Sequence, residues 1–142
     1  MKVTTLNRGG LVGEWKLDGN ALDTSGSGNN GTATNVTFTG TDRGYQSQCG
    51  VFNGSSSSVT AGSTLSSVLS TCFWIYPTSA TKTVITATGI TITIDGSSNI
   101  TSSGLTSPVY YINNVSSQAL TLNKWNFVVI THSSVNYASF NF

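Results

Sequence analysis

Apolar and polar residues alternate with a period of two along most of this chain. In the stretch GITITIDG, Ile90, Ile92 and Ile94 alternate with threonines, as expected for a strand that buries one face. The Asp95-Gly96 pair that follows is typical of a tight hairpin turn, because both residue types adopt positive φ readily. This segment therefore predicts a strand that ends in a hairpin.

Other short apolar runs follow the same pattern and are separated by clusters of Gly, Ser and Asn. They are LVGEWKL (11–17), NVTFT (35–39), CGVFNG (49–54), TCFWIYP (71–77), TVITAT (83–88), PVYYIN (108–113), WNFVVITH (125–132) and YASFNF (137–142). A helical period is missing almost everywhere. We therefore predict an all-β, antiparallel β-sandwich formed by a single domain over residues 1–142. The run TCFWIYP is apolar on both faces, which predicts an inner strand.

The composition narrows the possible partners of the protein. Only 8% of the 142 residues are charged and the formal net charge is +1, whereas about 25% is usual. The six scattered Lys and Arg residues form no basic stripe that could neutralise phosphates, which disfavours nucleic acid as a partner. No apolar run approaches the roughly 20 residues needed to cross a bilayer, and the first residues lack the apolar core of a signal peptide. The neutral, hydroxyl-rich surface predicts a location outside the cell or on a virion.

The two cysteines leave two alternatives open. Cys49 and Cys72 could form a disulfide only if their Cα atoms lie within about 7 Å of each other. Otherwise they are free thiols that pack as small apolar side chains. We expect free thiols.

The segment LDGNALDTSGSGNNG concentrates oxygen-bearing side chains in a chain with few charges. Asp18, Asp23, Asn20 and Asn29, together with loop carbonyls, offer the oxygen ligands that Ca²⁺ prefers. Alternatively, the two aspartates stabilise turns by accepting hydrogen bonds from nearby backbone N–H groups. The metal interpretation predicts a structural Ca²⁺ held by Asp18, Asp23 and Asn29.

Sugar recognition requires an exposed aromatic ring that can stack on the apolar face of a pyranose. Tyr76 ends one apolar run, and Tyr110 and Tyr111 must point to opposite faces of their strand. These three tyrosines are the candidate carbohydrate-binding residues, with ordinary packing as the alternative. Three tryptophans fall in the apolar register of their strands and are expected in the core: Trp15, Trp74 and Trp125.

Five blocks of the chain together resemble a known family. They are GLVGEWKLDGNALDTSGSGNNGTATNVTFT, GVFNGSSSSVTAGSTLS, TCFWIYPTS, LNKWNFVVITHSS and the D-x-S-G-x-G-N-x-G loop inside the first. In this order they resemble the laminin-G-like members of the concanavalin A-like lectin/glucanase superfamily. Phe73 stands where the family usually has Ala, and Asn53 where it often has Asp.

The resemblance implies a concanavalin A-like jelly roll and, in many relatives, a structural calcium ion. Such relatives usually continue to a closing strand that carries an acidic calcium ligand, and the resemblance implies that this strand does not follow YASFNF here. Residues 137–142 alternate like a strand whose backbone groups need a partner. We expect either a fragment of a longer protein or a homo-oligomer in which a neighbouring chain covers the open C-terminal edge.

Catalytic chemistry has little support in the sequence. Glu14 is the only glutamate, so the paired carboxylates of a glycosidase are not evident. His132 is the only histidine, and neither a G-x-S-x-G motif nor zinc-ligand spacing occurs. We expect His132 to lie at the surface, at the end of its strand.

We therefore predict a non-enzymatic, lectin-like module that binds a glycan or cell-surface polysaccharide as part of a larger surface or virion protein. The alternative is a structural or assembly domain that pairs through an exposed sheet edge and binds no sugar.

Overall fold

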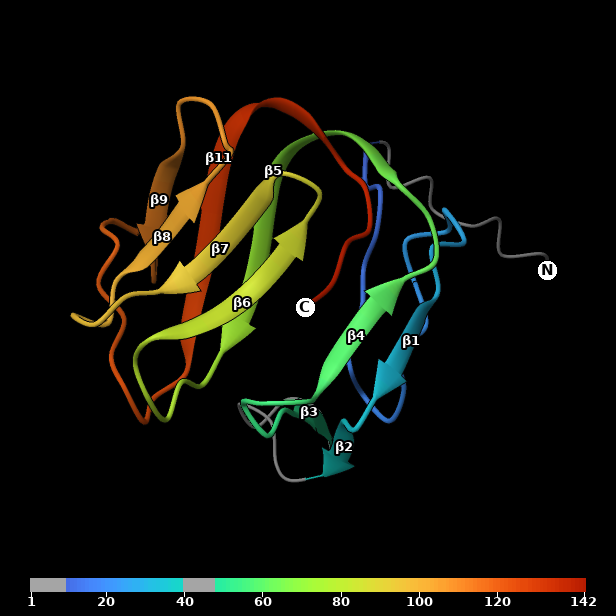
Figure 1. Ribbon diagram of the computed structural model, residues 1–142, viewed down its shortest axis with the longest axis horizontal. Helices are drawn as coiled ribbons and strands as arrows, with labels where there is room; N and C mark the ends of the chain where they lie inside the picture. Colours follow the sequence, from blue (N-terminus) through green and yellow to red (C-terminus); the bar gives the residue numbers. More distant parts are fainter. Residues whose placement is uncertain (1–9, 40–47) are drawn as a thin grey trace, which may run out of the picture.

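The computed structural model describes residues 10–39 and 48–142, and every regular element in them is a β-strand (Figure 1). None of these residues forms a helix of the length and apolarity that crossing a membrane requires. The strands are β1 Gly31–Thr34, β2 Thr37–Thr39, β3 Cys49–Val51, β4 Ser58–Ala61, β5 Leu65–Ile75, β6 Lys82–Ala87, β7 Ile90–Ile94, β8 Ile100–Ser103, β9 Val109–Ile112, β10 Val115–Ser116 and β11 Asn126–Tyr137.

One layer is a four-stranded antiparallel sheet with the strand order β10-β9-β11-β5. The two longest strands, β5 and β11, pair from Asn126 opposite Ile75 to Tyr137 opposite Leu65. The register shifts beyond Thr131, so the far end of this pair is irregular. The regular end of the pair therefore holds side chains at fixed positions on both faces of the sheet.

The second layer contains the pair β1-β4 and the antiparallel three-stranded sheet β6-β7-β8. The last residues of the chain run between β4 and β6 and connect them (Figure 1). Asn141 forms bridges to Thr60 on one side and to Thr86 on the other. The Phe142 carbonyl accepts a hydrogen bond from Val59 N–H at 2.6 Å, and the Asn141 carbonyl accepts one from Thr86 N–H at 2.9 Å.

These hydrogen bonds bear on the open C-terminal edge that was predicted from the sequence. Residues 137–142 were expected to expose backbone donors and acceptors to a partner, but β4 and β6 provide those partners within the chain. Only Tyr137 belongs to a regular strand, and Asn141 pairs through isolated bridges. The open edge predicted at these residues is therefore not found there.

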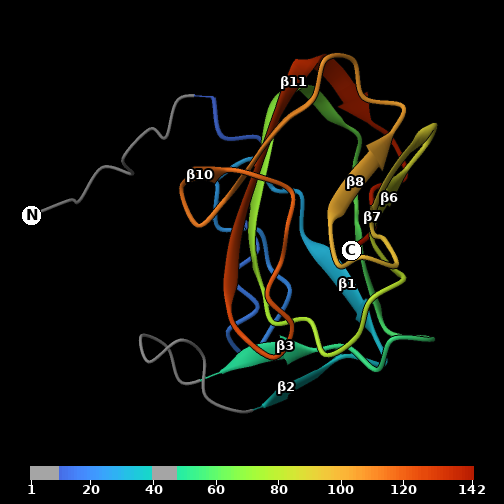
Figure 2. The same ribbon diagram turned by 90° about the vertical axis from the view of Figure 1, so that its left-hand side faces the viewer.

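The two layers face each other and enclose the apolar core (Figure 2). Ile90, Ile92 and Ile94 all point into it, which confirms the alternation predicted from the sequence. The structure thus confirms an all-β, antiparallel fold of sandwich type, whereas the jelly-roll connectivity stays a prediction. In the described part of the chain, five aliphatic side chains are 0% exposed: Val59, Ile92, Ile100, Val128 and Ile130.

Three local predictions were wrong. Residues 11–17 form no strand and contribute only an isolated bridge between Trp15 and Asp23. Strand β5, which contains most of TCFWIYP, lies at the edge of its four-stranded sheet instead of inside it. The β7–β8 hairpin exists, but its turn spans residues 95–99 and positive φ occurs at Ser98 (64°).

Candidate functional site

Asp23 organises the loop that the sequence singled out for calcium. Its Oδ1 accepts hydrogen bonds from the backbone N–H groups of Glu14 (2.9 Å) and Ser25 (2.8 Å). Its Oδ2 accepts bonds from the Ser25 hydroxyl (2.9 Å) and from Asn29 N–H (2.8 Å). Partial burial raises the pKa of this carboxyl, but the bonds from Ser25, Glu14 and Asn29 outweigh it and hold the pKa below its usual value. The turn-stabilising alternative describes what Asp23 does in this fold.

Asn29 fastens the same loop to its surroundings. Its Nδ2 donates to the Val12 carbonyl at 2.7 Å, and its own carbonyl accepts a hydrogen bond from Trp15 Nε1 at 3.0 Å. The Trp15 ring packs on Phe140 and Phe142, with centroids 5.5 and 5.3 Å away. Trp15 is packed against the core, as predicted, and the loop is thereby attached to the C-terminal segment.

The remaining predicted calcium ligands do not join this arrangement of hydrogen bonds. Asp18 is exposed, and the Oδ1 of Asn20 accepts a bond from Leu22 N–H at 2.9 Å. No group of three or more His, Cys, Asp or Glu side chains that could hold a metal occurs in residues 10–39 and 48–142. Both carboxylate oxygens of Asp23 already accept hydrogen bonds from N–H or O–H groups. Such donors stabilise the negative charge of Asp23 and occupy the oxygens that a cation would need. Calcium at Asp18, Asp23 and Asn29 stays a prediction.

The four-stranded sheet presents aromatic side chains on the face that points away from the core. Paired residues of β5, β11 and β9 share a face in rows, and one such row is Cys72–Val129–Tyr111. We call these side chains the outer face: Ser70, Cys72, Trp74, Tyr76, Val109, Tyr111, Trp125, Phe127, Val129 and Thr131.

Three rings of the outer face are substantially exposed. The exposed fractions are 47% for Trp74, 45% for Tyr76 and 38% for Tyr111. The Trp74 ring lies against Phe127 with centroids 5.0 Å apart, and Tyr76 contacts Trp125 edge-on at 5.7 Å. The first contact joins β5 to β11, and the second joins the residues that directly follow β5 and precede β11, at the end of the sheet where the register is regular.

The core position predicted for two of the three tryptophans is therefore wrong. Trp74 and Trp125 lie on the outer face and are not among the residues that pack against the core. In TCFWIYP, Phe73 and Ile75 take the inner positions, and Trp74 alternates to the outside. Because both registers of this run are apolar, its sequence did not reveal which one would be buried.

The three candidate tyrosines do not form one site. Tyr76 and Tyr111 lie on the outer face, whereas Tyr110 points inward and packs against the core. This confirms that the adjacent pair Tyr110 and Tyr111 points to opposite faces. The Tyr110 hydroxyl is hydrogen-bonded to the Ser102 hydroxyl, which connects β9 to β8 across the two layers.

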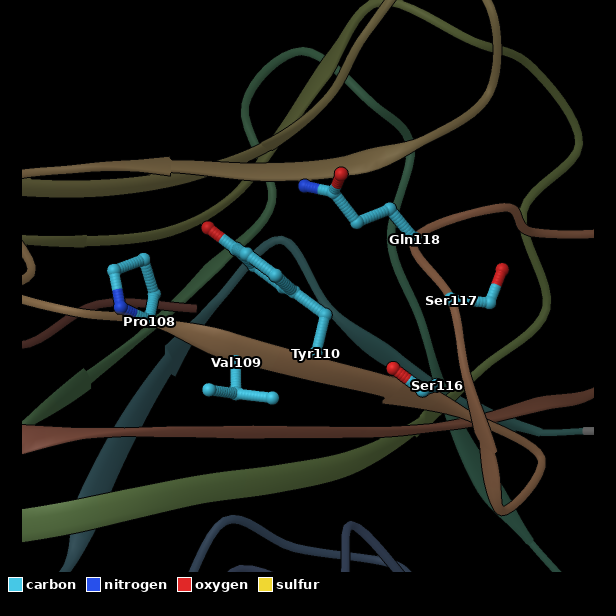
Figure 3. Close-up of a pocket in the computed structure, with 6 residues that line it drawn as sticks. All are labelled: Pro108, Val109, Tyr110, Ser116, Ser117 and Gln118. Carbon is cyan, nitrogen blue, oxygen red and sulfur yellow. The ribbon is translucent and has the colours of Figure 1, made fainter.

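Tyr110 lines a shallow, open depression of about 340 Å³ between β9 and the segment after β10. Figure 3 shows the Tyr110 ring and the Gln118 side chain on one side of the strand and Val109 on the other. Gln118 Nε2 donates to the Ile100 carbonyl at 3.0 Å. The amide and the tyrosine hydroxyl thus hold the two layers together at this edge. The residues that line the depression are Pro108, Val109, Tyr110, Ser116, Ser117 and Gln118.

The four strands of this sheet carry no Asp, Glu, Lys or Arg side chain. Their single ionisable basic group is His132, which is 8% exposed and faces the interior. The expectation that His132 lies at the surface is therefore wrong. Its Nε2 contacts the Tyr137 hydroxyl at 3.2 Å, and that hydroxyl lies 2.9 Å from Thr71 Oγ1.

The buried polar groups around His132 are paired with one another. Burial raises the pKa of Tyr137, although its bond to Thr71 acts in the opposite direction, so the phenol remains neutral at physiological pH. The Nδ1 of His132 lies 2.8 Å from the Ser133 carbonyl, which completes the chain of hydrogen bonds. Because these groups face the interior, they shape the core and not the outer face.

Both cysteines are free thiols, as expected. Cys49 is half-buried, but Cys72 is exposed on the outer face and is not packed.

Comparison with known proteins gave no match to a family model, to a curated protein sequence or to a solved structure.

Proposed function

We propose that this chain is a non-enzymatic carbohydrate-binding module that holds a glycan on the outer face of its four-stranded sheet. The observation that carries the proposal is the exposure of three aromatic rings, Trp74, Tyr76 and Tyr111, on one face of the four-stranded sheet. Burial of large exposed aromatic rings by a ligand lowers the free energy, so a surface that carries such rings is a candidate binding site. The proposed setting is an extracellular or virion-surface protein.

The chemistry around the rings favours a sugar as the covering group. Pyranose rings stack their C–H faces on aromatic side chains and direct their hydroxyls sideways to polar groups. The row Ser70–Thr131–Val109 places two exposed hydroxyl side chains beside the aromatic rows. The outer face thus combines flat apolar surfaces with neutral hydrogen-bonding groups.

The rings are also held in place before any ligand arrives. Phe127 supports Trp74 by a ring contact between β5 and β11, and Trp125 supports Tyr76 by a ring contact at the ends of these strands. Ordering a mobile side chain on binding costs about 0.5–1.5 kcal/mol. Because the partner rings already restrict Trp74 and Tyr76, this cost is reduced for a ligand that stacks on them.

Binding to an immobilised glycan panel tests the proposal with the full chain and the variants Trp74→Ala and Tyr76→Ala. We expect each variant to bind its glycan at least about fivefold more weakly, the loss expected for one ring contact of roughly 1 kcal/mol. Leu22→Ala is the matched control, since Leu22 is 53% exposed but belongs to the N-terminal loop. It should bind like the unmodified chain.

Two outcomes would overturn the proposal. One is a folded protein, verified by circular dichroism, that binds no glycan on the panel. The other is glycan binding that survives both ring substitutions. A tight dimer in size-exclusion chromatography that Trp74→Ala dissociates, combined with a blank panel, would instead support an assembly domain.

A further inference from the structure

We infer that the ligand of the outer face is an uncharged, linear polysaccharide that contacts several rings at once and needs no calcium. This inference rests on the proposed function and specifies the ligand class of the same site. It follows from the absence of charge on the sheet, the spacing of the rings and the position of the acidic side chains.

The absence of charge argues against an anionic glycan. None of the strands β5, β9, β10 and β11 carries Lys or Arg, so a sulfated or uronic acid polymer would find no counter-charge on them. Anionic groups are recognised mainly through such charges, most effectively in bidentate contacts with Arg. Among the described residues, the charged side chain next to an outer-face ring in the sequence is Lys124, which precedes Trp125 in the exposed turn before β11.

The ring spacing argues for several sugar units. Strand β11 lies between β5 and β9, so Trp74 and Tyr111 are two strand spacings apart, or about 10 Å. Trp74 pairs with Phe127 and Tyr111 pairs with Val129, which adds two residues, or about 7 Å, along the strands. The diagonal separation of roughly 12 Å exceeds the width of one sugar ring.

Tyr76 lies beyond Trp74 along the direction of β5, on the side away from the Tyr111 row. It follows β5 two residues after Trp74 and contacts Trp125, whereas Tyr111 lies beside Val129. The three rings therefore follow a bent path, which runs along β5 from Tyr76 to Trp74 and then diagonally across β11 to Tyr111. A single sugar can cover one of these rings, and only a chain of sugars can cover all three.

The site also contains no group that would bind calcium. The outer face includes no carboxylate, and the best-connected acidic side chain, Asp23, belongs to a loop outside this sheet. Calcium coordination needs several oxygen ligands, usually with carboxylates among them. Removal of calcium should therefore leave glycan binding unchanged.

Calorimetric titration of the full chain tests the inference with named probes. The neutral probes are oligomers of β-1,4-linked glucose, xylose and mannose and of α-1,4-linked glucose, each from monosaccharide to hexasaccharide. The anionic probes are heparin and polygalacturonate. We expect a neutral series to bind, with affinity that increases about tenfold or more from monosaccharide to hexasaccharide.

Variants show whether the rings produce this dependence on length. Tyr111→Ala should reduce the increase in affinity seen with the longer oligomers and leave the affinity for short ones nearly unchanged. The reason is that Trp74 and Tyr76 are near each other, whereas Tyr111 is the most distant of the three rings. Leu22→Ala should retain the whole gain. Raising NaCl from about 0.1 M to about 1 M, which shortens the screening length from about 10 Å to about 3 Å, should change Kd less than about twofold. EDTA should change it equally little.

The outcomes separate this inference from the proposed function. Binding of heparin or polygalacturonate but of no neutral oligomer overturns the inference and leaves glycan binding intact. Equal affinity for monosaccharide and hexasaccharide, or loss of binding in EDTA by a protein that stays folded, does the same. Failure of every probe on a folded protein overturns both.

Discussion

The two faces of the four-stranded sheet differ sharply, although the same strands form both. Along β11, Val128 and Ile130 are 0% exposed, while Phe127 and Val129 alternate with them and point to the outer face. The inner face fills the core mostly with aliphatic side chains, although Phe73 and Tyr110 also pack there. The outer face carries the exposed aromatic rings and hydroxyls beside a few smaller apolar side chains. The comparison teaches that one period-two pattern can supply stability on one side and a candidate recognition surface on the other.

The two faces also differ in the hydrogen-bond partners of their polar side chains. Asn126 is fully buried, and its amide donates to the carbonyls of Thr121 and Lys124 and accepts from Thr121 N–H. On the outer face, exposed hydroxyls such as those of Ser70 and Thr131 can be satisfied by water. A buried polar group is tolerated because it is paired, whereas an exposed one remains available to a ligand.

The largest expected effect is on the inner face. Ile130→Ala should lower the free energy of unfolding by about 2–5 kcal/mol, because it removes a fully buried side chain and leaves a cavity. Its neighbour Val129, on the outer face, is the control, and Val129→Ala should cost about 1 kcal/mol or less. Urea unfolding measures both. Equal losses would show that the two faces do not differ in their contribution to stability.

The next effect concerns the buried polar cluster. Tyr137→Phe removes the hydroxyl that contacts both His132 Nε2 and Thr71 Oγ1, and it should cost about 1–3 kcal/mol because both groups lose a partner. Thermal or urea unfolding measures the loss. If the variant is as stable as the unmodified chain, the cluster is not a stabilising element of the inner face. Tyr76→Phe, which removes a tyrosine hydroxyl on the outer face, serves as the comparison.

A smaller effect on stability is expected from the outer aromatic pair. Trp74→Ala should lower the free energy of unfolding by about 0.5–1.5 kcal/mol through loss of the contact with Phe127, while glycan binding weakens at least about fivefold. Unfolding and titration measured on one preparation separate the two effects. A loss of stability as large as that of Ile130→Ala would show that Trp74 mainly stabilises the fold and is not primarily a ligand-binding residue.

The smallest effect should come from the Asp23 loop, which belongs to neither face. The pKa of Asp23 is lower in the folded chain than in the unfolded chain, so its contribution to stability is present above the unfolded value of about 3.9 and is lost as pH falls through the folded value. We expect Asp23→Asn to cost about 1 kcal/mol at neutral pH, since partial exposure weakens these bonds. Melting temperatures measured from pH 7 to strong acid should converge for the variant and the unmodified chain. A difference that persists in acid would contradict an ionic origin.

How much of the fold was predictable depended on whether one face of a segment was clearly polar. The isoleucines of β7 alternate with threonines, and their burial was predicted correctly. In TCFWIYP both registers are apolar, so the burial of Phe73 and the exposure of Trp74 could not be read from the pattern. The surface position predicted for His132 was wrong, because its partner Tyr137 is five residues away and comes into contact only through the irregular end of β11.

The candidate site was predicted in part. Tyr76 and Tyr111 were identified from their chemistry, and strand geometry required Tyr110 and Tyr111 to diverge. Trp74 was missed because a tryptophan in an apolar run suggests a core residue. Its exposure depends on β5 pairing with β11 in one register, which places it opposite Phe127 on the face away from the second layer.

The sequence by itself determined the strand-forming pattern, the scarcity of charge and the residue types available for recognition, because these properties belong to single residues and their immediate neighbours. Only the tertiary structure decided which apolar face is covered and that residues 138–142 pair with β4 and β6. It also decided that Asp23 faces four hydrogen-bond donors. These outcomes depend on contacts between residues far apart in the chain, and alternation along one strand carries no information about which partner will lie against it.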